Sequence, residues 1–474
     1  MPHVGVDPQA EGHAKGDTND DYSFAVTELG RALTFGIHPS LDGIRALTEV
    51  LGRPQDSFAS VQVTGTNGKT SVTRLIEAIL SGEGLSAGAY TSPHLVSYTE
   101  RIEVDGKPIS RQDFARGVRA VLDARTAAAE DGADFTEFEL LTAAALWLFR
   151  DLAVDVAVLE VGMGGRWDAT SVVSPAVAVI TGVGLDHTDR LGTTVEEIAA
   201  DKAHIIKAAS APVLGPGTAD VAEIFLGRAR SLSTHPRFVA EASEPSPVAE
   251  DLTVRFAVTG RPGEPGGSLA LDVHGIHDDY PALRLRAPSY QAPNVAVALA
   301  AAEAALGRAL DLEALRASLL AMTFPGRFEV ARREPPLVLD GAHNPQAAAV
   351  LASAIDEAFG DDPPLAVLGI LGDKDAEGII AALGGHVSGF VCTQPDSPRA
   401  LGAHDLAVLV EQMTGAPCES YPELADALAA VGERGAAAVV TGSLYTAGQA
   451  RALLASGSGL LSWDWQGRAS RRRM

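Results

Sequence analysis

The chain has 474 residues, of which 37 are Lys or Arg and 61 are Asp or Glu, so its formal net charge is −24. This acidic balance argues against a protein that binds duplex nucleic acid, because such proteins normally present a basic face. Hydrophobic residues make up 46% of the chain and charged residues 21%, which is typical of soluble globular proteins and excludes wholesale disorder.

The cysteines and the termini point to the cytoplasm. The two cysteines, Cys392 and Cys418, have no metal-ligand spacing and form no disulfide framework, as in a reducing cytosol. Residues 1–21 are polar, without the apolar core of a signal peptide, and are predicted to be a flexible tail. The most apolar helical run, residues 294–322, is interrupted by charged side chains. We therefore expect a soluble cytoplasmic protein without membrane contact.

The first half of the chain alternates predicted strands and helices. Apolar residues at helical spacing predict a helix over 42–51, and a strand over 59–63 then leads through a glycine-rich turn into a helix that includes residues 74–80. Further strands are predicted over 154–161 and 176–181, and further helices over 110–129 and 137–150. The alternation predicts an α/β domain with a doubly wound, mostly parallel sheet.

The pattern of apolar and polar residues changes after residue 240. Short alternating segments between residues 241 and 288 predict a small antiparallel excursion, and an Ala-rich helical stretch follows over 289–322. A second α/β series then begins, with predicted strands over 337–339, 365–371, 389–393 and 437–441. We therefore expect three parts: the tail (1–21), a larger phosphate-loop domain (22–323) and a smaller Rossmann-like α/β domain (324–474).

The turn after the strand at 59–63 has the pattern of a phosphate loop. Residues 64–71 read Thr-Gly-Thr-Asn-Gly-Lys-Thr-Ser, between a strand and a helix. Small residues allow close backbone approach to a phosphate, and a helix N-terminus offers amide groups. Lys69 would neutralise phosphate oxygens, and the Thr70 hydroxyl would contact a metal or phosphate. Val63 replaces the first glycine of the strict motif, so an ordinary glycine-rich turn is the alternative.

Other polar residues follow predicted strands, and the residues alone leave their roles open. Glu160, at a strand end, would suit Mg²⁺ or would pair with an arginine. His187 is more easily explained as a structural residue than as a ligand, because Mg²⁺ seldom binds imidazole. Spacing alone would make Lys202 a surface charge. Asp340 and His343 would contact a ribose and a substrate carboxylate, or would serve only turn chemistry.

Taken together, these segments resemble the Mur-ligase superfamily and, within it, the folylpolyglutamate synthase family, whose bacterial members often also act as dihydrofolate synthases. The resemblance covers residues 39–448. Its motifs occur in the family's order: Gly65–Thr70, Thr91–Leu95 with Glu100–Ile102, Glu160–Arg166, Leu185–Thr188, Pro325–Arg327, Asp340–Pro345, Gly372–Asp375 and Thr441–Tyr445.

The resemblance implies roles for individual residues. ATP would be held by Gly65, Asn67, Gly68, Lys69, Thr70, Ser71, Asn294, Arg327 and Asp340. Magnesium, at two sites, would be held by Ser92, Glu160, His187 and a carbamoylated Lys202. The added glutamate would lie near His343 and Ser443, and the pterin side would be lined by Leu41, Asp42, Thr136, Phe138, Glu139, Arg166 and Asp168. The catalytic residues would be Lys69, Lys202 and His343.

Several positions depart from the family pattern. Asp201 and His204 replace the Glu and Gly that commonly flank the modified lysine, Tyr290 stands where His is frequent, and Ser171 replaces an Asn. Glu137 stands where an aromatic residue is usual, within the segment that would bind pteroate. None of these changes removes a proposed ligand.

The resemblance implies an ATP-dependent acid–amino-acid ligase of folate biosynthesis and one-carbon metabolism. It would add L-glutamate to a reduced folate, and in some members to dihydropteroate, through an acyl phosphate, and it would usually be a monomer. Two alternatives are a peptidoglycan-type Mur ligase acting on a UDP-linked substrate and a phosphate-loop protein that uses ATP as a switch. Against the first, only about 40 folded residues precede the phosphate loop, which leaves no room for a nucleotide-sugar domain.

Overall fold

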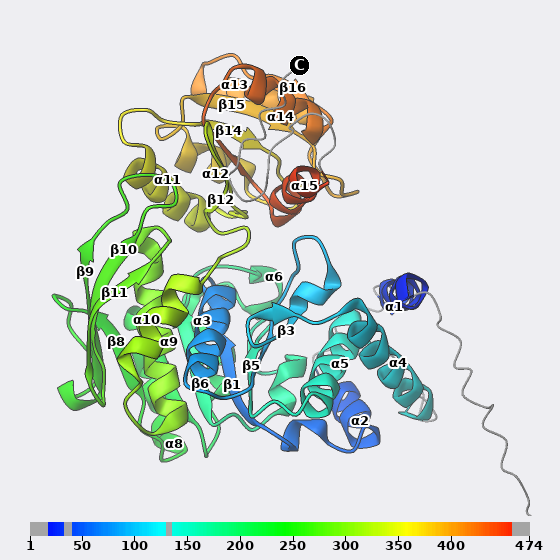
Figure 1. The fold of residues 1–474 in the computed structure, drawn as a ribbon, viewed down its shortest axis with the longest axis vertical. Coiled ribbons are helices and arrows are strands. Elements are labelled where there is room, and N and C mark those ends of the chain that lie inside the picture. Colours follow the sequence, from blue (N-terminus) through cyan, green and yellow to red (C-terminus); the bar gives the residue numbers. More distant parts are fainter. Residues whose placement is uncertain (1–17, 33–39, 129–134, 457–474) are drawn as a thin grey trace, which may run out of the picture.

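The computed structural model describes residues 18–32, 40–128 and 135–456. Within these residues the chain forms an eleven-stranded sheet and a six-stranded sheet, each covered by helices. Figure 1 shows the smaller sheet and its helices above the larger one. The predicted α/β class is confirmed, including the mostly parallel large sheet and the second, smaller α/β unit.

The large sheet has the strand order β11-β10-β9-β8-β7-β6-β1-β5-β2-β3-β4, and its strands from β8 to β2 are all parallel. The parallel strands are β1 (Ala59–Thr64), β2 (Ala87–Tyr90), β5 (Val156–Glu160), β6 (Val177–Gly182), β7 (Ala211–Gly217) and β8 (Arg237–Glu241). One edge is closed by the short antiparallel strands β3 (Ile102–Val104) and β4 (Lys107–Pro108).

The expected antiparallel excursion extends the other edge of this sheet. Strand β9 (Thr253–Gly260) runs parallel to β8, and β10 (Leu269–His274) and β11 (Asp279–Leu285) then continue in antiparallel fashion. The sheet therefore grows outward from its parallel centre, and the phosphate loop after β1 remains at that centre.

Helices cover both faces of the large sheet because successive side chains of a strand point to opposite faces. Val61, Val63, Val156 and Val158 pack with α3 (Lys69–Gly82), α9 (Ala292–Leu306) and α10 (Leu312–Ala321). The opposite face is covered near β5 by α1 (Thr18–Ala32), α2 (Asp42–Val50), α4 (Arg111–Ala128) and α5 (Glu137–Asp151). Near β6 it is covered by α7 (Val195–Lys202) and α8 (Ala222–Ser231), with the short α6 (Thr188–Leu191) preceding α7.

The small sheet has the order β12-β13-β17-β14-β15-β16 and is parallel apart from its first strand. Its strands are β12 (Glu329–Arg333), β13 (Pro336–Leu339), β14 (Leu365–Leu368), β15 (Gly389–Thr393), β16 (Glu419–Tyr421) and β17 (Ala438–Thr441). Its helices are α11 (Pro345–Phe359), α12 (Ala376–Leu383), α13 (Ala403–Thr414), α14 (Leu424–Glu433) and α15 (Leu444–Ala455).

Two local predictions are wrong. The stretch predicted as one helical run over 289–322 is divided into α9 and α10, because Gly307 takes a left-handed conformation with φ of +65° and Asp311 caps the next helix through the Ala314 amide. The predicted tail also extends too far, since α1 begins at Thr18. Residues 1–17 lie outside the described residues.

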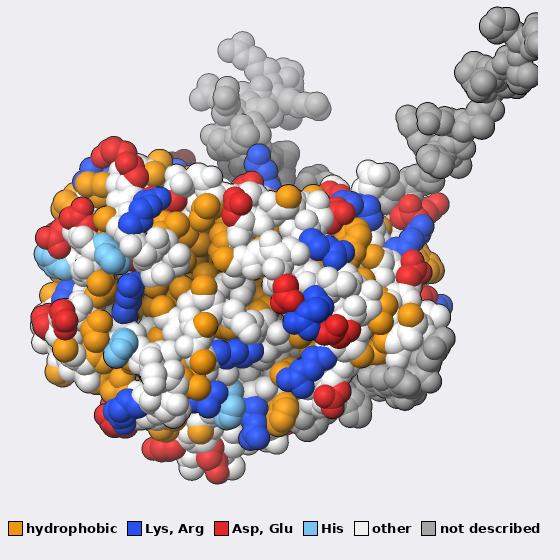
Figure 2. All heavy atoms as spheres, turned by 90° about the horizontal axis from the view of Figure 1, so that it is seen from below, with side chains coloured by type: hydrophobic (Ala, Val, Ile, Leu, Met, Phe, Trp, Pro, Cys, Tyr) orange, Lys and Arg blue, Asp and Glu red, His pale blue; other side chains and the backbone are white. Residues whose placement is uncertain are grey.

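The described helices include none that is long and apolar enough to cross a membrane. Figure 2, which views the molecule from below, shows Lys and Arg side chains separated by acidic, apolar and uncharged ones. This face therefore presents no continuous basic surface.

Candidate active site

The segment between β1 and α3 forms the loop that the sequence predicted. The helix begins at Lys69, directly after Gly68, and its first turn has no side-chain cap, which leaves amide groups for an anionic ligand. Gly68 has a φ of +83°, and a Cβ atom there would lie 2.8 Å from Oδ1 of Asn294. A larger residue would strain the backbone and collide with Asn294, so this position requires glycine.

Two lysine ammonium groups meet at one carbonyl of this loop. The Gly65 carbonyl oxygen lies 3.0 Å from Nζ of Lys69 and 3.1 Å from Nζ of Lys202. Lys202 is only 3% exposed, so the surface position expected from spacing alone is wrong. Burial lowers the pKa of Lys202 to about 7, and the positive charge of Lys69 acts in the same direction.

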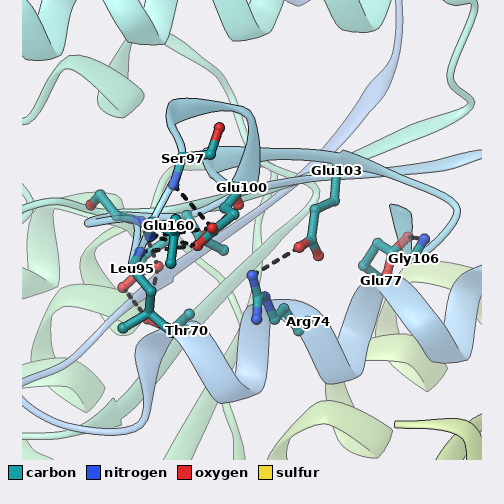
Figure 3. Close-up of polar contacts among 12 residues, drawn as sticks. Thr70, Arg74, Glu77, Leu95, Ser97, Glu100, Glu103, Gly106 and Glu160 are labelled. Carbon is teal, nitrogen blue, oxygen red and sulfur yellow. Dashed lines mark hydrogen bonds and ion pairs between the residues drawn. The ribbon is translucent and has the colours of Figure 1, made fainter. Parts of the chain in front are cut away.

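Glu160 ends β5 beside the first turn of α3, as Figure 3 shows. Its carboxylate accepts hydrogen bonds from the Thr70 hydroxyl at 2.9 Å and from the Ser92 amide at 3.0 Å. Burial raises the pKa of Glu160, while the nearby charge of Lys69 opposes that rise. The partners of this carboxylate are thus a hydroxyl in the first turn of α3 and an amide of the loop after β2, and an oxygen-preferring cation could join them.

Lys69, Thr70, Ser92 and Glu160 line a cavity of about 500 Å³, and residues of the segment after α10 form much of its other wall, whereas Gly65 and Lys202 are not among its lining residues. The predicted site residues that line it are Asn67, Gly68, Lys69, Thr70, Ser71, Ser92, Glu160, His187, Asn294, Arg327, Asp340 and His343. The fold therefore brings the phosphate loop and the motif after β13 to one space.

Asp340 serves the turn and also lines the cavity. Its two carboxylate oxygens accept hydrogen bonds from the amides of Phe328 and Ala342, each at 2.8 Å. Burial raises the pKa of Asp340, and the charge of Arg327 opposes that rise. The turn interpretation of this residue is therefore confirmed, and its position on the cavity wall keeps a contact with a ligand as a prediction.

His343 is held in one tautomer. Its Nδ1 atom lies 2.8 Å from the Gly341 carbonyl oxygen, which can only accept, so Nδ1 carries the proton. Burial lowers the pKa of His343, so the ring is neutral near pH 7 and its Nε2 atom is an acceptor.

Sequence reasoning missed the apolar side of the cavity. Ala347, Val350 and Leu351 of α11 line it together with Tyr290. Asn344 caps α11 through the Ala347 amide, so the turn after β13 also fixes this helix face. The spacing of Ala347, Val350 and Leu351, at i, i+3 and i+4, was the available signal.

His187, one of the predicted metal ligands, has a partly exposed side chain. It has a positive φ of +49°, its side chain is 41% exposed, and burial of its ring lowers its pKa. Among the described residues no group of three or more His, Cys, Asp or Glu side chains is placed to hold a metal ion. A cation at Glu160 would therefore need hydroxyl groups, water and phosphate oxygens for its remaining contacts.

Comparison with known proteins agrees with this geometry. Residues 63–215 match the Mur ligase middle domain, and residues 326–444 match the Mur ligase glutamate ligase domain. The dihydrofolate synthase/folylpolyglutamate synthase of Mycobacterium tuberculosis is 38% identical over 454 residues, covering 88% of this chain and 90% of that protein. The chain belongs to the dihydrofolate synthase/folylpolyglutamate synthase family.

Solved structures of this family have the same fold. M. tuberculosis folylpolyglutamate synthase complexed with ADP is 37% identical, with a TM-score of 0.84 over 92% of this chain and 99% of that one. Escherichia coli FolC in complex with DHPP and ADP is 29% identical, with a TM-score of 0.80 over 93% and 99% of the two chains.

Of the residues that family resemblance places on the pterin side, Phe138 and Asp168 lie beside Gly162, which lines the cavity. Thr136 caps α5, and its hydroxyl and amide both contact the Glu139 carboxylate, at 2.8 and 2.9 Å. A Cβ atom at Gly162 would lie 2.7 Å from the ring of Phe138, and Gly162 itself lines the cavity. The start of α5 therefore adjoins the end of β5 and its glutamate.

The remaining pterin-side residues differ in exposure. Leu41 is buried, whereas Asp42 and Arg166 are exposed. The Arg166 guanidinium lies 4.7 Å from the centre of the Trp167 ring, and the Asp168 carboxylate accepts the Met163 amide at 3.0 Å. Asp42 and Arg166 therefore have exposed surface for a ligand, whereas Leu41 and Asp168 are buried.

Ser443 and Glu137 are engaged in contacts within the protein. Ser443 is 1% exposed and caps α15 through the Thr446 amide at 3.0 Å, and it does not line the cavity. Glu137 accepts the Tyr98 hydroxyl at 2.8 Å and lies 3.9 Å from Arg101. The carboxylate that replaces the usual aromatic residue thus ties α5 to the loop after Ser92.

Proposed function

We propose that this chain is an ATP-dependent ligase that joins L-glutamate to the carboxylate of a reduced folate, with dihydropteroate as a second acceptor. The observation that carries the proposal is the shared cavity, in which the phosphate loop and Glu160 face Arg327, Asp340 and His343. Related structures contain ADP, and one contains DHPP as well, which supports a nucleotide in this cavity and a second ligand beside it.

The reaction needs activation because a carboxylate is a poor electrophile. The folate carboxylate attacks the γ-phosphorus of ATP and gives an acyl phosphate and ADP, and the glutamate amine then displaces phosphate. Lys69 and the amides of α3 offset the charge of the transferring phosphoryl group. The neutral His343 lies at the cavity wall, and its Nε2 atom accepts a hydrogen bond from the glutamate amine. Arg327 and Asp340 from the smaller domain complete the site and exclude water from the acyl phosphate.

The nucleotide base has a suitable place on the apolar side of the cavity. We assign the adenine ring to the face formed by Tyr290 and by Ala347, Val350 and Leu351 of α11. Asn294, which contacts Gly68, would then lie between the phosphates and the base.

Magnesium fits one part of the site directly. The Glu160 carboxylate and the Thr70 hydroxyl, with Ser92 beside them, are oxygen donors of the kind that Mg²⁺ prefers when it also binds nucleotide phosphates. Bound there, the ion would neutralise phosphate charge. His187 and Lys202 would serve a second ion only after CO₂ has converted the Lys202 amine into an anionic carbamate, because an ammonium repels a cation.

We place the domain boundary in the segment between α10 and β12, on either side of which the chain enters a different sheet. We propose a monomeric cytoplasmic enzyme. The peptidoglycan-type alternative is not favoured, since the matching relatives are folate enzymes.

Product analysis by mass spectrometry tests the function. The chain is offered ATP, magnesium and L-glutamate with dihydropteroate, tetrahydrofolate or a UDP-linked muropeptide precursor. We expect glutamate to be added to the pteridine substrates only. Lys69→Ala should lower the rate at least about 100-fold with an unchanged melting curve, while Lys107→Ala, on the exposed strand β4, should match the wild type. Addition to the UDP-linked substrate alone, or a folded and fully active Lys69→Ala variant, would refute the proposal.

A further inference from the structure

The two cysteines of the chain are brought together by the small sheet, away from the residues that line the active-site cavity. Cys392 lies in β15 and Cys418 directly precedes the edge strand β16. Their Sγ atoms are 3.3 Å apart, although 26 positions separate them in the sequence. Both side chains belong to the same apolar cluster of the smaller domain.

The two thiols differ in exposure and in hydrogen bonding. Cys392 is fully buried, whereas Cys418 is partly exposed. The hydrogen bond between the two thiols lowers the pKa of Cys418, and the same bond together with burial raises the pKa of Cys392. A reagent from solvent therefore meets Cys418 first, and Cys418 is also the thiol that more readily becomes the nucleophilic thiolate.

Acidic groups surround the outer thiol. The Cys418 amide donates to the Glu411 carboxylate at 3.0 Å, and Glu419 follows in the sequence, paired with Arg434. Both carboxylates act to raise the pKa of Cys418, so they oppose the effect of the thiol pairing. They also disfavour the approach of an anionic reagent, and a neutral oxidant is the appropriate probe.

We propose that Cys392 and Cys418 form an oxidation site that reacts with a small disulfide and closes an intramolecular disulfide bond. The Cys418 thiolate attacks one sulfur of the oxidant, whose S–S bond breaks and releases one thiolate, leaving a mixed disulfide on Cys418. Cys392 then loses its proton and attacks Cys418 Sγ, and the second oxidant sulfur leaves. The two cysteines lose two electrons and two protons, and the oxidant is reduced to two thiols.

The bond would close a loop that contains α13 and would tie β16 to its neighbour. A cross-link that closes a loop restricts the unfolded chain, so the smaller domain should become more resistant to heat. The edge strand would also be held in register with β15.

The test treats the full native chain with 2-hydroxyethyl disulfide, which is neutral, and maps its peptides without reduction. We expect the wild type to yield a linked Cys392–Cys418 peptide pair, lighter by two hydrogens and without a retained adduct. Cys392→Ser should keep the adduct on Cys418, and Cys418→Ser should stay unmodified until it is unfolded in urea. The oxidised wild type should melt several degrees higher than the reduced protein, and dithiothreitol should reverse the change.

If a serine variant fails to fold, the result for the wild type is sufficient to test the proposal. A wild-type protein that keeps the hydroxyethyl adduct on Cys418 with Cys392 reduced would overturn the proposal. So would a native wild type that stays unmodified under conditions in which its urea-unfolded form reacts fully.

Discussion

Replacing Lys202 with methionine tests whether burial of the charged amine beneath the phosphate loop lowers the free energy of unfolding. The lysine is 3% exposed, and its Nζ shares the Gly65 carbonyl with Lys69. Methionine has a similar length without the charge, so it removes the ionisable group and should preserve most of the packing.

The size of the effect follows from the two pKa values. The pKa of Lys202 falls from an ordinary value of 10.5 to about 7 in the folded protein. Between these values the unfolded chain binds more protons, so the stability of the folded state rises with pH through this window. The difference corresponds to a cost of about 5 kcal/mol below pH 7, of which about 3 kcal/mol is regained between pH 7 and 9.5.

The assay is urea unfolding of the wild type and Lys202→Met at pH 7 and 9.5 in CO₂-free buffer, with Lys107→Met as a control for the loss of an exposed lysine. The stability difference between wild type and Lys202→Met should change by about 3 kcal/mol between the two pH values, and Lys107→Met should follow the wild type. Parallel pH dependence of the wild type and Lys202→Met would show that the buried-ammonium reasoning is wrong.

Bicarbonate adds a second readout on the same variants. Near pH 7 about half of the Lys202 amine is neutral and can react with CO₂. With ¹³C-bicarbonate we expect one slowly exchanging carbamate signal in the wild type and in Lys107→Met. The signal should be absent from Lys202→Met, and its persistence there would assign the carbamate elsewhere.

Three further substitutions probe the surroundings of the site. Glu77→Gln should raise the melting temperature at pH 8 far more than at pH 5. Burial raises the pKa of Glu77 from 4.5 to about 7, so the folded wild type loses stability as the pH rises between these values, and the glutamine variant lacks this loss; equal shifts at the two pH values would contradict this. Glu160→Gln should lower steady-state turnover about 100-fold or more with a nearly unchanged melting curve, so wild-type turnover would exclude a role at the phosphates. Tyr98→Phe should raise the KM for folate more than that for ATP, because the hydroxyl that positions Glu137 is lost; an effect on ATP alone would refute it.

Local sequence determined the half of the site that binds phosphate. A strand, a turn with Gly68 in a left-handed conformation and a helix that begins at Lys69 are all specified within a dozen residues. Such a unit depends on backbone conformation and short-range hydrogen bonds, so its pattern is visible without any distant contact. The strands with continuous apolar runs could be predicted for a similar reason. Strand β7 contains Pro212 and Pro216 and was not predicted.

Apart from what the family resemblance implied, only the tertiary structure decided which distant residues lie together. Nothing near Lys202 in the sequence indicates burial, which arises because α7 packs its last turn against the phosphate loop. His343 and Lys69 line the same cavity because of the way in which two separate sheets meet. Cys392 and Cys418 lie close together because of the register of β15 and β16. Burial, charge proximity and strand register are set by contacts between remote segments, so local propensities could not supply them.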